Sequence, residues 1–470
     1  MDHLSTDVFQ DLISWIDPDD FKNLRLANRS LDNATEAAFW AERTVKVMIN
    51  DETDLEVGLK RLEGFRSKPE SSAKIQKLEI ELSVEEGEEE RLRGVLPDAL
   101  HALQGLRSVR YWISSADPAW LRDTVLEALS ALPLLSTLFI SANSTSTYDD
   151  QPPVPLHYFR HGRLESLSVH ARFEDPDLFT SSLSTILAHN PSIGHLDLHF
   201  HYMFNTPTQQ FSDIFRQPLP KSLQLETLIL YGYLAEFTKD VTPHLRSLRR
   251  IELHDRQGEF YSHVWDTLRT ERIYPRHIIV NNPHENFLEH IESFSGLETL
   301  TIRDAGATQQ EDSDRLAQRF YRQALLKHQA SLRELSISST GPGLWSYGAW
   351  NVDVLDGCMA LESLRVNVCE DDIYATEDPE QNIVGKLIRH ALALPKLRTL
   401  HIVPAFNGRD GGGMSFIASG IGQIGRIVES VRFIPKSRPP LEIKVYGSHG
   451  THLPEASEEG ESRFRFVSDF

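Results

Sequence analysis

A short pattern of apolar residues, L-x-x-L-x-L, returns at intervals along most of this chain of 470 residues. Clear copies are LESLSVH at 164–170, LETLTIR at 297–303 and LRTLHIV at 397–403. Because side chains alternate between the two faces of a strand, each copy predicts a short strand with one leucine-lined face. One unit of this size cannot bury that face alone, so the recurrence predicts stacked units that form one solenoid.

Successive copies begin 23 to 36 residues apart, and helical patterns such as 119–132 and 177–190 occupy many of the gaps. Prolines follow several of these patterns, where they end a helix before the next strand; they are Pro133, Pro191, Pro220 and Pro395. The predicted strands are 74–82, 106–112, 135–141, 164–170, 193–199, 225–231, 248–254, 274–280, 297–303, 332–338, 361–367, 397–403 and, weakly, 428–434. The alternation predicts an α/β fold with parallel strands inside and helices outside.

This arrangement resembles the leucine-rich-repeat family, and the resemblance implies an irregular solenoid over residues 74–446. In that family an asparagine or cysteine after each strand bonds the neighbouring backbone. Asn143 and Cys369 occupy that position here, whereas Tyr233, Arg256 and Ala305 stand there in other repeats. Because these three side chains do not suit a buried ladder of hydrogen bonds, we expect variable curvature and several long loops.

The N-terminal segment 4–47 has the pattern of three short helices followed by a strand. Val8 and Ile16 belong to an apolar face at helical spacing, and Asp17-Pro18 ends one helix and begins the next. A bundle of about 40 residues has more apolar surface than it can bury by itself. We therefore expect it to pack on the following domain and to offer a face to a partner helix.

The residue order of this segment resembles the F-box, especially in its fungal form. The matching residues are Leu4, Asp7, Val8, Trp15, Ile16, Asp17, Pro18, Asp20, Phe21, Leu24, Arg25, Leu26, Arg29, Ser30, Leu31, Phe39 and Trp40, while Ser5 replaces the usual proline. The resemblance implies that residues 1–48 dock on a Skp-type adaptor and through it on a cullin–RING ubiquitin ligase. It places Leu4, Val8, Ile13, Ile16, Pro18, Leu24 and Leu26 at that interface. The alternative is an ordinary helical cap on the solenoid.

Composition excludes several classes of function. The net charge of −20 disfavours binding to nucleic acid, which needs a basic stripe. The sequence predicts neither a secretory signal nor a membrane span. The only two cysteines, Cys358 and Cys369, predict a reducing compartment. We therefore expect a cytoplasmic or nuclear protein whose partners are proteins.

Segments outside the repeats are predicted to be connections and loops. Residues 49–73 join the F-box-like segment to the solenoid, and residues 447–470 form an acidic, polar C-terminal tail. Acidic stretches at 85–90 and 371–380, and a glycine-rich stretch at 407–415, are typical of solvated loops. Loops on one rim of a solenoid also serve as lids or docking segments.

One motif suggests nucleotide binding but lacks the necessary context. GIGQIG at 420–425 satisfies G-x-G-x-x-G, whose glycines let a pyrophosphate approach the start of a helix. The segment after it reaches Pro435 too early for a full crossover helix and is partly strand-like. We therefore predict no nucleotide and no other cofactor, and the sequence has none of the usual hydrolase, zinc-protease or P-loop motifs.

A second cluster carries metal-ligand types. His195, Asp197, His199 and His201 alternate along one predicted strand, so their side chains share a face. Ligands two residues apart on a strand are separated by about 7 Å, which is too far for one zinc ion. We therefore predict polar contacts rather than a metal site.

The residues beside the leucines predict where a protein would bind. They form the inner row of the solenoid, and aromatic, arginine and histidine side chains are enriched where partners anchor. The predicted contacts are Trp112, Phe139, His195, His199, Tyr231 and Arg250, with Trp112, Phe139, Tyr231 and Arg250 as the main anchors. The alternative is that the F-box helices or a loop cover these rings, because solenoid ends need capping.

Together these patterns predict a non-catalytic subunit of a ubiquitin ligase complex. The F-box end would bind the adaptor, and the solenoid would hold an unknown protein substrate. The alternative is a scaffold or interaction protein whose F-box-like segment no longer engages a ligase. Co-purification with the adaptor would separate the two.

Overall fold

The computed structural model divides into two compact units. Unit 1 contains the described residues up to Gly232 together with 239–246, and unit 2 contains 235–238 and the described residues from Ser247 onward. The structure describes residues 40, 43–49, 52–82, 89–114, 117–143, 154–160, 162–171, 176–200, 210–216, 219, 221–232, 235–254, 261–306, 310–339, 341–405, 414–435, 439–456 and 461–468. Apart from Trp40, the predicted F-box helices lie outside these residues, as do all seven predicted adaptor contacts.

The strands of unit 1 pair in chain order and run parallel. They are β1 (Thr44–Ile49), β2 (Lys77–Leu82), β3 (Ser108–Ser114), β4 (Thr137–Asn143), β5 (Ser166–Ala171), β6 (His195–Phe200) and β7 (Thr227–Tyr231). The pairing aligns Leu138 with Leu167, and Leu196 with Leu228, all of them buried. The alternation of leucines thus produces the sheet and its buried face, as the sequence predicts.

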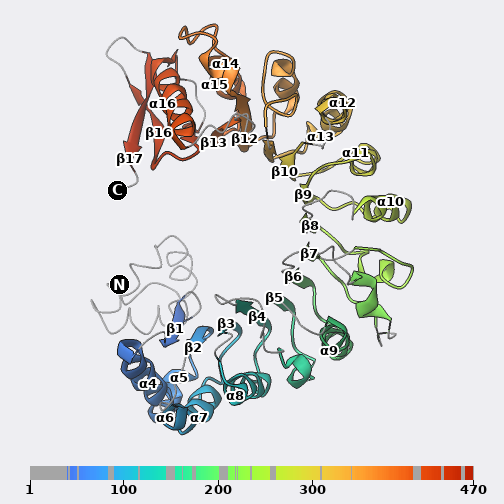
Figure 1. Ribbon diagram of the computed structural model, residues 1–470, viewed down its shortest axis with the longest axis vertical. Helices are drawn as coiled ribbons and strands as arrows, with labels where there is room; N and C mark the ends of the chain where they lie inside the picture. The colour runs from blue at the N-terminus through green and yellow to red at the C-terminus, as the bar shows by residue number, and fades with distance from the viewer. Residues whose placement is uncertain are drawn as a thin grey trace, which may run out of the picture. The chain divides into compact units, whose positions relative to one another are not determined.

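Helices and short helical turns cover the leucine-lined side of the unit 1 sheet (Figure 1). They are α4 (Glu52–Ser67), α5 (Pro69–Ser72), α6 (Glu89–Arg93), α7 (Leu96–His101), α8 (Ala119–Ser130), η2 (Leu156–Tyr158), α9 (Pro176–His189), η3 (Phe211–Phe215) and η4 (Thr242–His244). Residues 49–73, predicted as a connecting segment, hold the end of β1 and all of α4. Leu55, Leu59 and Leu62 of α4 are buried, so this segment is part of unit 1.

Unit 2 repeats the parallel arrangement and then changes direction. Its parallel strands are β8 (Arg250–His254), β9 (His277–Asn281), β10 (Thr299–Ala305), β11 (Glu334–Ser339), β12 (Ser363–Cys369), β13 (Thr399–Ala405) and β15 (Glu442–Val445). Antiparallel pairs then join β15 to β16 (Gly450–Ala456), β16 to β17 (Ser462–Ser468), and β17 to β14 (Arg432–Phe433). An antiparallel edge ends the parallel stack.

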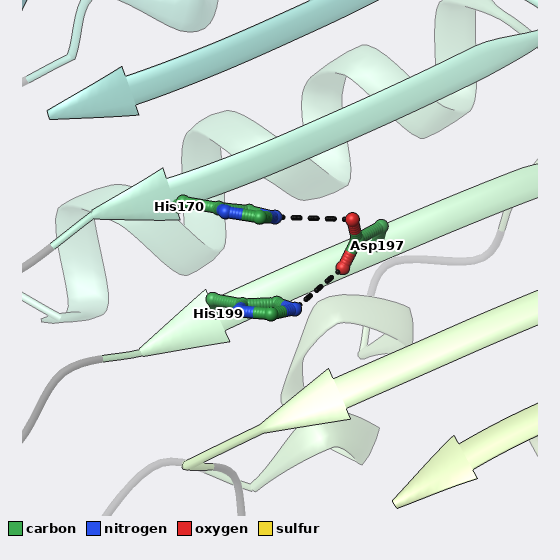
Figure 2. A group of neighbouring side chains, drawn as sticks. All are labelled: His170, Asp197 and His199. Atoms are coloured by element: carbon green, nitrogen blue, oxygen red, sulfur yellow. Dashed lines mark hydrogen bonds and ion pairs between the residues drawn. The ribbon is translucent and has the colours of Figure 1, made fainter. Parts of the chain in front are cut away.

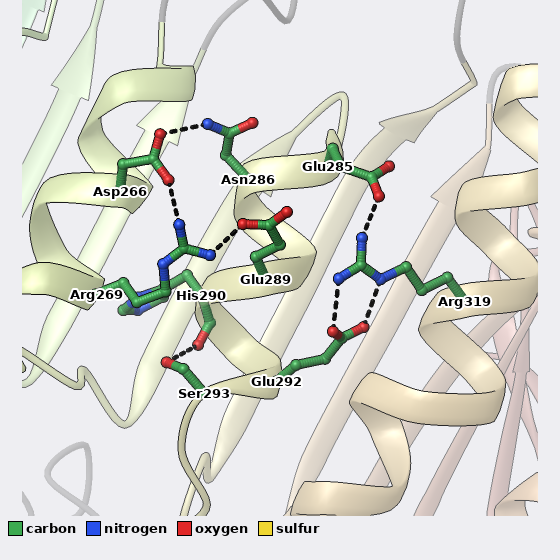
Figure 3. A network of polar contacts seen from close by, with 9 residues as sticks. All are labelled: Asp266, Arg269, Glu285, Asn286, Glu289, His290, Glu292, Ser293 and Arg319. Carbon is green, nitrogen blue, oxygen red and sulfur yellow. Dashed lines mark hydrogen bonds and ion pairs between the residues drawn. The ribbon is translucent and has the colours of Figure 1, made fainter.

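The helical elements of unit 2 also lie on one side of its strands (Figure 1). They are α10 (Ser262–Thr270), α11 (Glu285–Glu292), α12 (Gln310–Arg319), the π-turn η5 (Phe320–Ala324), α13 (Leu325–His328), η6 (Val352–Gly357), α14 (Glu370–Tyr374), α15 (Ile383–Ala393) and α16 (Met414–Ser430). Ion pairs join neighbouring helices (Figure 3): Arg269 of α10 contacts Glu289 of α11, and Arg319 of α12 contacts Glu292 of α11 at 2.7 Å. Arg269 also contacts Asp266 of its own helix. These partly exposed pairs add only modestly to stability.

Buried polar side chains connect successive repeats at the turn before a strand. The side-chain oxygen of Asn190 accepts a hydrogen bond from the Leu164 backbone N–H at 3.0 Å. The Nδ1 atom of His244 accepts from the Leu223 N–H at 2.8 Å, and Nδ1 of His328 accepts from the Leu297 N–H at 3.3 Å. These side chains satisfy backbone groups that would otherwise be buried without a partner. They lie before the strands, whereas the family's asparagine ladder follows them.

The weak repeat predicted at 428–434 is mostly wrong. Helix α16 continues to Ser430, and only Arg432 and Phe433 form a strand, which pairs antiparallel with β17. Ile424, Ile427 and Val428 are buried at helical spacing, and this spacing overrides the partial strand pattern.

Two segments predicted as loop or tail contain regular structure. The acidic stretch 371–380 begins inside α14, where the buried side chain of Ile373 fixes the helix. The C-terminal segment 447–470 contains β16 and β17, and the buried ring of Phe464 stacks on Phe433 with centroids 4.8 Å apart. In both segments a few apolar residues among many charges are enough to order the backbone.

Candidate functional site

A row of rings lies on the face of the unit 1 sheet that points away from the helices, opposite the buried leucines. This face holds the predicted inner row, and we call it the outward face of the sheet. We call Trp112, Phe139, His170, His199 and Tyr231 the aromatic row. Neighbouring ring centroids are 5.8 Å apart for Trp112 and Phe139, and 4.8 Å for Phe139 and His170. They are 3.8 Å apart for His170 and His199, and 5.5 Å for His199 and Tyr231. All five side chains are partly exposed, so the row offers ring surface to a partner.

Strand register explains why the rings meet. Trp112 aligns with Ser141, Ser141 with His170, His170 with His199, and His199 with Tyr231. Ser141 is small and buried, so Phe139, two residues earlier on the same strand, supplies the ring between Trp112 and His170. The row is therefore continuous although β4 has no aromatic residue at the aligned position.

A charged group borders the aromatic row on β1 to β3. Glu79 forms an ion pair with Lys46 at 2.7 Å and lies 4.0 Å from Arg110. The Arg110 guanidinium lies 5.4 Å from the centre of the Phe139 ring, which is a cation–π distance. Arginine beside aromatic rings is a combination enriched at protein interfaces.

The His170, Asp197 and His199 side chains form a triad in the middle of the row (Figure 2). Nε2 of His170 lies 3.0 Å from Oδ2 of Asp197, and Nε2 of His199 lies 3.0 Å from Oδ1. Burial alone would raise the pKa of Asp197, but the contacts with His170 and His199 outweigh it and hold that pKa well below its usual range. The carboxylate is therefore ionised at neutral pH.

Arg250 lies on β8 in unit 2 and belongs to a separate cluster. Its Nε atom donates to Oε1 of Glu252 at 2.9 Å, and Nε2 of His254 lies 3.2 Å from Oε2 of the same carboxylate. Burial would raise the pKa of Glu252, but His254 and Arg250 lower it below its usual value. Arg250 is half-exposed and remains a predicted partner contact of unit 2.

The structure brings together Trp112, Phe139, His199 and Tyr231, all of which are predicted partner contacts. His195 shares β6 but aligns with Ser166 and Thr227 rather than with the ring positions. The sequence reasoning missed His170, whose ring joins the two halves of the row. The signal was present, because LESLSVH places His170 at the same outward position as His199 in IGHLDLH.

The structure also places the other motifs considered from the sequence. GIGQIG lies within α16 rather than at its start, so its backbone N–H groups are used by the helix. Cys358 is buried, and burial raises the pKa of its thiol to about 12, so it is not a reactive thiolate. The sequence argument against a metal site considered ligands on one strand only, whereas the triad takes His170 from β5 and Asp197 and His199 from β6. His201, the fourth residue of that argument, lies outside the described residues.

In the described part of the chain, no helix has both the length and the hydropathy that a membrane span requires. A comparison with models of known protein families finds no match for the chain, and a comparison with curated protein sequences finds none either.

Proposed function

We propose that the chain is the substrate-recognition subunit of a ubiquitin ligase of the Skp adaptor, cullin and F-box type. The observation that supports substrate recognition is the aromatic row on the sheet of unit 1. The proposed binding to the adaptor rests on the F-box-like residue order of segment 4–47. The aromatic row binds a protein substrate, and the N-terminal segment binds the adaptor.

Physical chemistry supports a row of rings as a binding surface. Aromatic side chains bury a large area with few rotatable bonds, and the stacking within the row already holds the rings in place. Pre-ordered side chains lose little entropy when a partner binds. Most of the affinity is then expected from a few central anchors, with Trp112, Phe139 and Tyr231 the foremost candidates in unit 1.

The proposed role needs no catalytic residues in this chain. Holding a substrate close to a ubiquitin-charged enzyme raises the effective concentration of the acceptor lysine, and that proximity accelerates the transfer. The second candidate function is a scaffold that uses the same aromatic row but binds no adaptor. The aromatic row favours both functions equally, and adaptor binding separates them.

The test is binding of the purified full chain to a purified Skp-type adaptor. We expect a complex, and we expect Ile16→Asp and Leu24→Asp each to weaken it by about 3 kcal/mol, because each puts an unpaired charge into an apolar contact. Leu178→Asp is the matched control, because Leu178 is 54% exposed on α9. This variant should bind the adaptor as well as the wild type does. Adaptor binding that survives both N-terminal changes in a folded protein would refute the F-box assignment. A chain that binds no adaptor would favour the scaffold.

A further inference from the structure

We propose that His170, Asp197 and His199 form a binding site for a divalent transition metal ion of the zinc class. Two imidazole nitrogens and one carboxylate oxygen are ligand types that Zn²⁺ prefers. The three ligand atoms all lie within 4.8 Å of one another. This inference does not depend on the proposed role in a ubiquitin ligase.

The geometry approaches that of a zinc site with three protein ligands. Bonds of about 2.1 Å in a tetrahedral site place ligand atoms roughly 3.4 Å apart. The His170 nitrogen is already 3.0 Å from Oδ2 of Asp197, and the His199 nitrogen is 3.0 Å from Oδ1 of the same carboxylate. The widest separation, at most 4.8 Å, must shrink by about 1.4 Å to reach that value. Small rotations of the partly exposed histidine side chains can supply this change.

The parallel register removes the main objection to a metal at this place. Ligands along β6 alone are too far apart, but His170 of β5 is the direct neighbour of His199 in the pairing. Their rings stack with an interplanar angle of 11°, and both direct Nε2 toward the same carboxylate (Figure 2). The sheet backbone therefore brings the three side chains together before any ion binds, which reduces the ordering cost of binding.

The Asp197 carboxylate provides a second, independent observation. Its side chain is only 13% exposed, and its Oδ1 atom is buried. Oδ1 contacts Nε2 of His199 at 3.0 Å, and Oδ2 contacts Nε2 of His170 at 3.0 Å, so both oxygens of the carboxylate face imidazole nitrogens. A buried carboxylate needs such partners, because burial of an unpaired charge is costly. A metal ion between the carboxylate and the imidazoles would satisfy it.

The remaining coordination position faces the outward side of the sheet, because the three ligands are outward-facing side chains. Both histidines keep part of their surface exposed, at 22% for His170 and 24% for His199. A fourth ligand can therefore reach the ion, either a water molecule or a donor atom from a bound protein. The site then combines a metal with the rings of the aromatic row on one surface.

The test is titration of the metal-stripped full chain with Zn²⁺ by calorimetry, and with Co²⁺ by visible absorption. We expect about one ion per chain and the absorption bands of tetrahedral cobalt. His170→Ala and His199→Ala should each weaken zinc binding by more than about 100-fold, because even changes behind the ligands cost 10- to 100-fold. Zinc should raise the thermal midpoint of the wild type but not that of the variants.

Two further variants distinguish loss of a ligand from loss of fold. Asp197→Asn keeps the side-chain shape but removes the charge, so it should bind zinc weakly while its circular dichroism spectrum stays unchanged. His195→Ala removes a histidine from the same face of β6 outside the triad, and it should bind zinc normally. Equal zinc binding by the wild type and the three triad variants would overturn the proposal, as would absence of zinc binding to the wild type. In either case the triad would be a hydrogen-bonded brace of the aromatic row.

Discussion

The outward strand faces of the two units differ although their inward faces are alike. In unit 1 the outward positions of β3 to β7 carry rings that contact one another. In unit 2 the positions that correspond to Tyr231 and Phe139 carry His254 and Glu252 on β8, and Arg303 and Thr301 on β10. Glu252 contacts both Arg250 and His254, so these side chains form ion pairs instead of a row of rings. The inward residues maintain the repeat, so the outward residues are free to differ with function.

The two units also differ in the contacts that their outward side chains make within the same unit. Further along unit 2 the Arg365 guanidinium lies 5.6 Å from the centre of the Tyr446 ring, and Asn367 is buried. Arg250 and Arg365 thus have contacts within unit 2, whereas the rings of unit 1 present apolar area in addition to their mutual contacts. We therefore expect unit 1 to contribute more binding energy and Arg250 to contribute less, because a partner must compete with Glu252 for it.

The largest expected effect tests whether the inward faces are equivalent. Leu196→Ala in unit 1 and Leu300→Ala in unit 2 each remove a fully buried side chain from an aligned leucine position. Each should lower the free energy of unfolding by about 2 to 5 kcal/mol through lost burial and a cavity. Urea unfolding followed by circular dichroism measures this. A loss below about 1 kcal/mol in only one unit would show that the inward faces are not equivalent.

A smaller effect should separate the units by pH. Burial lowers the pKa of His284 to about 4 and that of His290 to about 3, both in unit 2. The unfolded chain binds these protons near pH 6.5, so the stability of unit 2 should fall as the pH drops below about 6.5. In unit 1 burial raises the pKa of Asp117 to about 7. Its folded form binds a proton that the unfolded form takes up only near pH 4, so Asp117 adds stability as the pH falls from 7 to about 4.

Hydrogen exchange read by mass spectrometry, corrected for the intrinsic pH dependence, measures the two units separately. Between pH 7 and about 5 we expect protection of α10 and α11 to fall by a few kcal/mol in total. In unit 1 Asp117→Asn should abolish the gain in stability that protonation of Asp117 gives as the pH falls. Burial also lowers the pKa of His244 in this unit, and that shift acts in the opposite direction. If protection of α10 and α11 does not change over this range, the lowered pKa values of His284 and His290 would be contradicted.

The sequence predicts the repeating part of the fold well because the signal is local. Alternation of leucines within a strand determines which side chains are buried, so strands such as β6 and β10 lie where the pattern places them. It also predicts four ring positions of the aromatic row. It fails where the outcome depends on several segments: α16 forms through buried contacts at helical spacing, and β16 and β17 order each other.

The candidate site was less predictable for the same reason. Which residues on neighbouring strands face each other depends on the register between repeats, and loops of unequal length conceal that register in the sequence. Asp197 therefore appeared to have ligands only along its own strand. Aligning LESLSVH with IGHLDLH places His170 beside His199, and the pairing of β5 with β6 shows that the two side chains meet. Nothing in the spacing of Trp112 and Phe139 indicates that Ser141 makes room for their contact.

The most direct test of the binding surface places a photo-crosslinking residue on either side of unit 1, with a substrate protein bound to the full chain. We predict that benzoylphenylalanine at Tyr231 crosslinks to the bound protein and that the same residue at Leu178 on α9 does not. Trp112→Ala should weaken binding by about 2 kcal/mol, and Arg250→Ala by less. Crosslinks from Leu178 alone, together with normal binding by Tyr231→Ala and Arg250→Ala, would contradict the account.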